Sequence, residues 1–146
     1  MIHRILAAID TSPRAPGVLS AAREIAARFG ARLHVYQAVY VPPDIPAAAH
    51  TQDDGTDDQL RGLARKRLAA MVADAPDVVL EPLEFGVGQP WRAILAAAKR
   101  IDADLIVMGS HGYGGFDRLI GTTAGKVVNH ASRSVYVVHE RAQRGR

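Results

Sequence analysis

The chain has 146 residues, of which 48% are hydrophobic and 23% charged, as is typical of one globular domain and unlike a disordered chain. It contains no cysteine, which excludes disulfides and thiolate chemistry. The formal charge is only +3, and Arg141, Arg144 and Arg146 fall in an expected flexible tail at residues 141–146, so the composition does not favour nucleic acid as a partner.

The first part of the chain predicts a strand, a helix and a second strand. Residues 3–9 form a nearly continuous apolar run, typical of a strand buried on both faces. Asp10-Thr11-Ser12-Pro13 then supplies capping groups and a proline suited to a first helical turn. Gly30 is a natural helix end, and residues 32–39 predict the second strand. The apolar face of the helix consists of Val18, Leu19, Ala22, Ile25, Ala26 and Phe29.

The middle of the chain predicts a long loop, a helix and an edge strand. Residues 41–58 are rich in Pro, Asp and Ala and lack periodicity, which indicates the loop. Residues 78–85 predict a third strand, which Pro82 places at a sheet edge. The helix between them ends before Pro76 and has Leu60, Leu63, Ala64, Leu68, Met71 and Val72 on its apolar face. Its basic cluster of Arg61, Arg65, Lys66 and Arg67 fits a solvated helix face better than a nucleic-acid site.

The last part of the chain continues the alternation. Pro90 opens a third helix, and residues 105–108, 123–131 and 135–138 predict a strand, a helix and a final strand. The order β-α-β-α-β-α-β-α-β implies an α/β fold, a doubly wound five-stranded parallel sheet with helices on both faces. We expect a single domain over residues 1–146. The third helix has Trp91, Ile94, Leu95, Ala98 and Ile101 on one face, where Trp91 is interpreted as core or interface filler.

Neither a membrane nor a secretory pathway is indicated. No apolar run approaches the ~20 residues that a spanning helix needs. The strand pattern begins so early that no signal peptide fits before it. We therefore expect a cytoplasmic protein.

Two loops carry the residues that could bind a ligand. In doubly wound sheets, ligands lie beyond the carboxyl ends of the strands. Asp10 follows the first strand, and the glycine-rich stretch 109–115 follows the fourth, where glycines allow sharp turns and close approach of main-chain N–H groups. Gly121-Thr122-Thr123 then adds hydroxyls and unpaired helical N–H donors that suit phosphate. If the first and fourth strands are neighbours, Asp10 faces the glycine loop across a nucleotide site.

Other interpretations of these residues stay open. The glycine loop matches neither the Walker A pattern nor the dinucleotide fingerprint, and a simple turn would also use glycine. Asp10 and Thr122 could each serve as a helix N-cap. His34, His130 and His139 show no metal-ligand spacing, and no catalytic set of Ser, His and Asp can be assembled.

The glycine loop and its flanks resemble the universal stress protein family. The resemblance lies in Val107-Met108-Gly109-Ser110-His111-Gly112, in Gly121-Thr122-Thr123-Ala124 and in Val87-Gly88-x-Pro90, and it covers essentially the whole chain. It implies a Rossmann-like fold of the adenine nucleotide alpha hydrolase type. Family members that bind ATP carry Gly-x2-Gly-x9-Gly-Ser/Thr. This chain has eight residues between Gly112 and Gly121, and we expect Gly114 and Gly115 to absorb the missing one.

The resemblance also implies which residues bind the nucleotide. Asp10 would contact the ribose or phosphate region, and the main chain at Val35, after the second strand, would meet the adenine edge. Met108 and Gly109 would lie along the ribose. The phosphates of ATP, with Mg²⁺, would be received by Gly112, Gly121, Thr122 and Thr123.

The expected role is that of an ATP-binding, stress-responsive regulator and not a committed enzyme. The family implies a homodimer formed by antiparallel pairing of the last strand, from Val135 to Val138. A slow ATPase or nucleotide-dependent phosphotransfer protein is one alternative. A nucleotide-free interaction module is another, which the short glycine spacer would favour.

Overall fold

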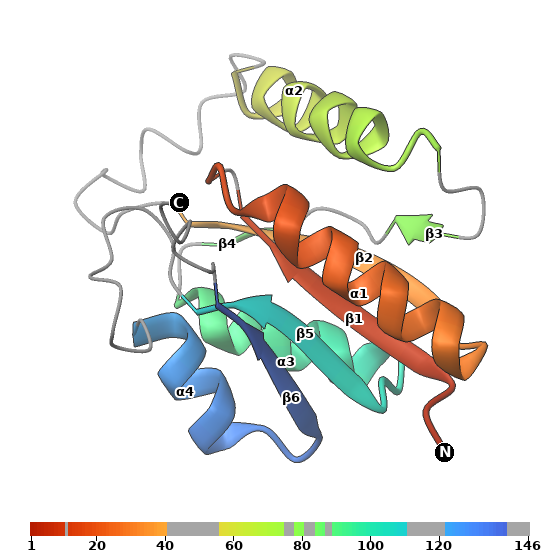
Figure 1. Ribbon diagram of the computed structural model, residues 1–146. Coiled ribbons are helices and arrows are strands. Elements are labelled where there is room, and N and C mark those ends of the chain that lie inside the picture. The colour runs from red at the N-terminus through yellow and green to blue at the C-terminus, as the bar shows by residue number, and fades with distance from the viewer. Residues whose placement is uncertain are drawn as a thin grey trace, which may run out of the picture.

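Strands and helices alternate along the chain in a computed structural model that describes residues 1–10, 12–40, 56–74, 78–80, 84–86, 89–110 and 122–139 (Figure 1). The long loop and the tail expected from the sequence lie mostly outside these residues. The elements are β1 (Arg4–Ile9), α1 (Ala15–Phe29), β2 (Arg32–Tyr40), α2 (Thr56–Met71), β3 (Val78–Leu80), β4 (Glu84–Gly86), α3 (Pro90–Arg100), β5 (Leu105–Gly109), α4 (Thr122–His130) and β6 (Ser134–Val138).

The sheet is parallel throughout, with β1 at its centre. Its strands have the order β3-β2-β1-β5-β6, and β4 pairs with the second half of β2. The chain moves outward from β1 to β2 and β3 and then resumes on the other side of β1 with β5 and β6. This confirms the predicted doubly wound α/β fold and places the reversal of strand order between β1 and β5.

The predicted third strand is divided into β3 and β4. Between the pairs Val35↔Leu80 and Ala38↔Glu84, β2 advances three residues while the neighbouring chain advances four. One additional residue therefore separates the two strands, in the segment that contains Pro82, whose ring removes a main-chain donor. The predicted edge position is confirmed, since β3 ends the strand order.

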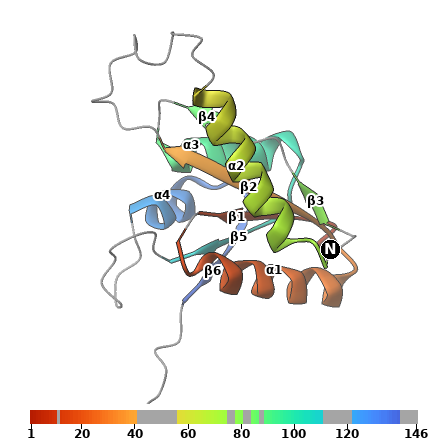
Figure 2. The same cartoon turned by 90° about the horizontal axis from the view of Figure 1, so that it is seen from above.

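Alternate residues of the central strands face two separate hydrophobic cores. Ile5 and Ala7 of β1 pack with α1 and with Leu68 of α2 on one side of the sheet. Leu6 and Ala8 pack with α3 and α4 on the other side. Figure 2 shows α1 on one face of the sheet and α3 and α4 on the opposite face. The helices thus cover both faces, as expected.

Three details of the predicted helices are wrong. Phe29, expected on the buried face of α1, is 55% exposed, and Leu63 of α2 is equally exposed. Among the described side chains of α2, those that pack on the core are Leu68, Met71 and Val72 at its end; the side chains of Leu60 and Ala64 lie outside the described set. The expected loop 41–58 is also too long, because α2 begins at Thr56.

Left-handed residues end α1 and α3. Gly30 follows α1 with φ of 60°, as predicted, and Asp102 follows α3 with φ of 52°. The N–H of Ala103 donates to the carbonyl of Ala98, and that of Asp102 to Lys99, which is the Schellman pattern. Aspartate tolerates this conformation better than most residues with a side chain.

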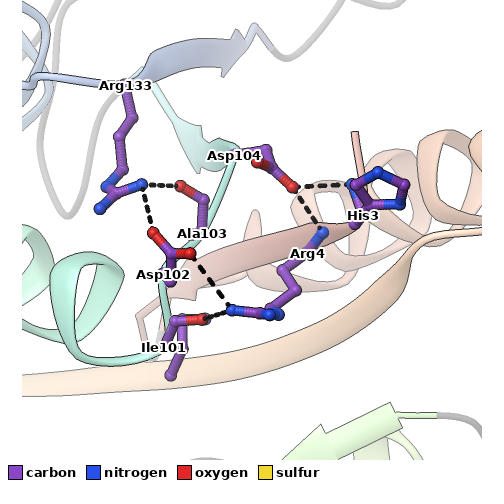
Figure 3. Close-up of polar contacts among 7 residues, drawn as sticks. All are labelled: His3, Arg4, Ile101, Asp102, Ala103, Asp104 and Arg133. Carbon is purple, nitrogen blue, oxygen red and sulfur yellow. Dashed lines mark hydrogen bonds and ion pairs between the residues drawn. The ribbon is translucent and has the colours of Figure 1, made fainter. Parts of the chain in front are cut away.

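A polar network then joins three segments at the amino edge of the sheet (Figure 3). The carboxylate of Asp104 accepts hydrogen bonds from the N–H groups of His3 at 2.7 Å and Arg4 at 2.9 Å. Asp102 pairs with Arg4 at 3.5 Å and with Arg133 at 3.2 Å. Arg133 also donates to the carbonyl of Ala103 at 2.6 Å. The starts of β1, β5 and β6 are thereby held together.

The pKa of Asp104 is lowered from its ordinary value. The N–H group of His3 contributes most, followed by that of Arg4, because both donate to the charged carboxylate. A carboxyl group with a lowered folded-state pKa adds stability above its unfolded-state pKa. That contribution is lost as the pH falls through the folded-state pKa.

We therefore expect Asp104→Ala to lower the free energy of unfolding at neutral pH. The loss should diminish as the pH falls below about 4, because the parent protein then loses the same charged acceptor. Urea unfolding of parent and variant, followed by circular dichroism at several pH values, measures this convergence. Asp74→Ala, which removes an exposed carboxylate, serves as the control with little effect throughout. A destabilisation by Asp104→Ala that is independent of pH would contradict this account.

Candidate functional site

The pairing of β1 with β5 brings two predicted site segments together. Their register runs from Ile5↔Leu105 to Ala8↔Met108. Continued for two residues, it places Asp10 level with Ser110, at the beginning of the glycine-rich stretch. The condition set by the sequence, that the first and fourth strands be neighbours, is therefore confirmed.

The turn after β1 is built by the side chain of Asp10. Its Oδ1 accepts a hydrogen bond from the N–H of Ser12 at 2.9 Å, and Ser12 Oγ accepts one from the N–H of Arg14 at 3.3 Å. The residue that caps α1 is Arg14, without a side-chain hydrogen bond, so an N-cap role for Asp10 is wrong. The proline in the first turn of α1 is likewise Pro16 and not Pro13.

One oxygen of Asp10 is left for another partner. The side chain is half-buried, and within the described part of the chain its Oδ2 accepts no hydrogen bond. A half-buried carboxylate oxygen at the carboxyl edge of the sheet can accept a hydrogen bond from a ligand hydroxyl or bind a cation. Asp10 therefore combines a structural role through Oδ1 with an available acceptor.

The end of β5 presents main chain in place of side chains. Met108 is 5% exposed and packs in the core with α3 and α4. Gly109 is half-buried, and Ser110 is buried with its N–H donating to the carbonyl of Val138 at 3.0 Å. Gly109 thus ends the strand without a side chain that would cover the edge.

The expected position of Val35 is wrong. Val35 lies in the middle of β2, paired with Ala7 on one side and with Leu80 on the other, and it is fully buried. The register Ile9↔Gln37 shows that Ala38 is the residue level with Asp10. Gln37, a buried polar residue, and Ala38 are therefore the β2 residues at this edge. The predicted strand 32–39 ends four residues beyond Val35, so its bounds already indicated that Val35 lies inside the strand and not after it.

The start of α4 supplies hydroxyls and N–H donors at the same edge. Because β5 and β6 are parallel, α4 must carry the chain back from the carboxyl edge to the amino edge. Thr122 and Thr123 are its first residues, so their N–H groups are among the four without a partner inside the helix. Thr122 is exposed and Thr123 half-buried. Gly112, Gly121 and the spacer between them lie outside the described residues, as does Thr11.

The described residues offer no ready-made metal centre. Nowhere among them do three or more His, Asp or Glu side chains gather in a group that could hold a metal ion. Of the helices in the same part of the chain, none is both long and apolar enough to cross a membrane. The described residues at this edge thus supply one carboxylate, main-chain groups and two threonine hydroxyls.

Comparison with known proteins identifies the relatives of this chain. The family model described as "Universal stress protein family" matches residues 1–139. The chain is 30% identical to universal stress protein A homolog 1 of Coxiella burnetii over 141 residues, which cover 92% of this chain and 94% of that protein.

Solved structures show the same architecture. The universal stress protein UspA from Lactobacillus plantarum superposes with a TM-score of 0.70 at 27% identity, covering 94% of this chain and 98% of that one. The universal stress protein from Archaeoglobus fulgidus, solved in complex with dAMP, gives a TM-score of 0.63 at 23% identity and covers 94% of this chain and 97% of that one. With its parallel sheet, its polar carboxyl edge and a family match over nearly its whole length, this chain belongs to the universal stress protein family.

Proposed function

We propose that the protein binds ATP at the carboxyl edge of the sheet, between β1, β5 and α4, and acts in the cytoplasm as a stress-responsive regulator. The observation that carries the proposal is the register that sets Asp10 beside Ser110, with the first residues of α4 at the same edge. The relative from Archaeoglobus fulgidus that was solved with dAMP supports a nucleotide as the ligand.

Each part of the nucleotide has a suitable partner in this arrangement. Asp10 Oδ2 is an acceptor for a ribose hydroxyl, which needs a nearby carboxylate or carbonyl oxygen. The main chain of Gln37 and Ala38 takes the role at the adenine edge that was expected of Val35. The N–H groups and hydroxyls of Thr122 and Thr123 are donors to phosphate oxygens, aided by the helix dipole of α4.

The donor set also fits Mg²⁺ bound together with the phosphates. Mg²⁺ usually retains several waters and takes only one or two carboxylates beside the phosphate oxygens. Asp10 is a carboxylate of this kind at the edge. In this mode the ion would neutralise charge on the triphosphate, and Asp10 Oδ2 would orient one of its waters in place of a ribose hydroxyl.

Asp10→Asn separates the structural role of Asp10 from its binding role. Asparagine keeps an oxygen for the N–H of Ser12 but removes the charge. We expect stability within about 0.5 kcal/mol of the parent protein and an ATP affinity that falls about tenfold or more, since hydrogen bonds to charged groups contribute about 1.5–3 kcal/mol. Isothermal titration calorimetry with ATP and Mg²⁺ measures the affinity.

Asp10→Ala is the matched comparison, because it removes the acceptor of the turn as well and should lower both stability and affinity. If Asp10→Asn bound ATP as tightly as the parent protein, Asp10 would have no place in the binding site.

Direct identification of the ligand tests the proposal as a whole. Mass spectrometry of the material released from denatured purified protein should detect ATP, and calorimetry with ATP, ADP and AMP should rank ATP first.

Gly112→Val should abolish binding while the protein still folds, since valine adds bulk and favours different dihedrals in a glycine loop. Absence of bound nucleotide together with no heat on titration would establish a nucleotide-free interaction module. Phosphate release above background that Asp10→Asn abolishes would indicate the slow ATPase or phosphotransfer alternative.

We also propose that two copies pair through β6. This strand ends the sheet, so its outer main-chain groups face away from β5. Tyr136 is 50% exposed, and its neighbours Val135 and Val137 are only half-buried. An apolar edge strand of this kind favours pairing with another chain.

Tyr136→Lys should yield a monomer, because a charge on an edge strand opposes strand pairing. Sedimentation velocity of parent and variant at matched concentrations measures the change. Val128→Lys, at an exposed apolar position of α4 (44% exposed), is the control that should leave the assembly unchanged. A Tyr136→Lys variant that sediments as the parent does would place the interface elsewhere.

A further inference from the structure

The outer surface of α3 and α4 carries positive charge without any carboxylate. The sequences of the two helices, PWRAILAAAKR and TTAGKVVNH, contain no Asp or Glu. Their basic side chains are Arg92, Lys99 and Arg100 in α3 and Lys126 and His130 in α4. Helices α1 and α2, by contrast, mix both signs of charge.

Three of these basic side chains lie around the indole ring of Trp91. The ring of His130 stacks on it at 4.8 Å between centroids and 23° between planes. Arg92 Cζ lies 5.1 Å and Lys126 Nζ 6.0 Å from the ring centroid. The indole Nε1 donates to Gln89 Oε1, which fixes the orientation of the ring. We call Trp91, Arg92, Lys126 and His130 the Trp91 patch.

Within the part of the chain that the structure describes, no carboxylate compensates the charges of Arg92 and Lys126. Arg92, Lys126 and His130 are exposed, and in the described ranges none of them forms an ion pair. Other arginines do so: Arg28 pairs with Glu24 at 2.8 Å, and Arg4 and Arg133 pair with Asp102. Lys99 lies seven residues after Arg92 and therefore extends the positive charge along the same side of α3.

Packing between the two helices accounts for only part of this arrangement. The stack of Trp91 on His130 joins α3 to α4, and cation–π contacts at exposed sites are weak. A structural contact needs one such partner, whereas here two cations lie within 6.0 Å of the same ring centroid. Positive charges that no described carboxylate pairs with, gathered around a half-buried tryptophan, fit a surface that receives an anionic partner.

We propose that the Trp91 patch docks an acidic segment of a partner protein. Carboxylates of such a segment would pair with Arg92 and Lys126, and an apolar side chain would pack against Trp91 and the neighbouring half-buried Leu95. Tryptophan and arginine are the residue types that most often dominate protein–protein interfaces. The charge complementarity would also raise the rate of association.

Single-stranded nucleic acid fits the patch less well. Proteins that bind it offer successive aromatic side chains on which bases stack. Trp91 is the single aromatic residue of α3 and α4 apart from His130, and its ring already stacks on that imidazole. The patch therefore offers charge to a nucleic acid but not a row of stacking surfaces.

Trp91 itself provides the signal for the test, since the chain has a single tryptophan. The probe is a short peptide rich in glutamate and leucine, without tryptophan, titrated at low salt. We expect a saturable change in Trp91 emission that weakens on addition of salt. Reversing two charges, with Arg92→Glu and Lys126→Glu together, should lower the affinity at least about tenfold.

Arg65→Glu with Arg67→Glu is the matched control. It changes the net charge equally, at two exposed positions of α2 on a different part of the molecule, and it should preserve binding. Thermal unfolding by circular dichroism checks that both double variants fold. Calorimetry with ATP should give the same affinity for all three proteins, so a failure here is distinguishable from a failure of the nucleotide site.

Three outcomes would overturn the proposal. Equal losses in the two double variants would show a non-specific effect of net charge. Tighter binding of a single-stranded DNA of equal charge than of the peptide would assign the patch to nucleic acid. Unchanged Trp91 emission and no binding of the peptide would leave the patch a packing contact between α3 and α4.

Discussion

Strand β1 lies between β2 and β5, and both helical layers reach the sheet through its two faces. Ile5 and Ala7 belong to one core and Leu6 and Ala8 to the other, so a slip of one residue would exchange the two sets. The same register determines what stands beside Asp10 at the carboxyl edge. Pairing at the centre of the sheet thus specifies both the hydrophobic cores and the geometry of the polar edge.

The order and type of the elements could be predicted because each has a local cause. The apolar run before Asp10 can be buried only in a central strand, and Gly30 ends α1 because it adopts φ of 60°. Exposure of Phe29 and Leu63 could not be predicted, since periodicity identifies a helix face but not how far the neighbouring sheet extends beneath it. The division of the edge strand into β3 and β4 likewise depends on its pairing with β2.

The candidate site was predictable where it depends on strand ends and not where it depends on register. Asp10 and Gly109 each follow an apolar run, which a parallel sheet brings to one edge. Val35 was misplaced because a sequence does not show which residue of β2 stands level with Asp10, and Ala38 emerges only from the pairing. The bonds from His3 and Arg4 to Asp104 join residues about a hundred positions apart and leave no local sequence signal.

The hydrogen bond from the N–H of Ser110 to the carbonyl of Val138 has a mechanical consequence. It fastens Val138, the last residue of the edge strand, to Ser110, near the start of the glycine-rich stretch 109–115. A ligand that displaced Ser110 would strain or relax β6, and a second copy paired with β6 would act back on Ser110. Thermodynamic reciprocity requires the two effects to be equal in free energy. If ATP binds at the carboxyl edge and two copies pair through β6, as proposed above, this one amide links the two events without movement of a whole domain.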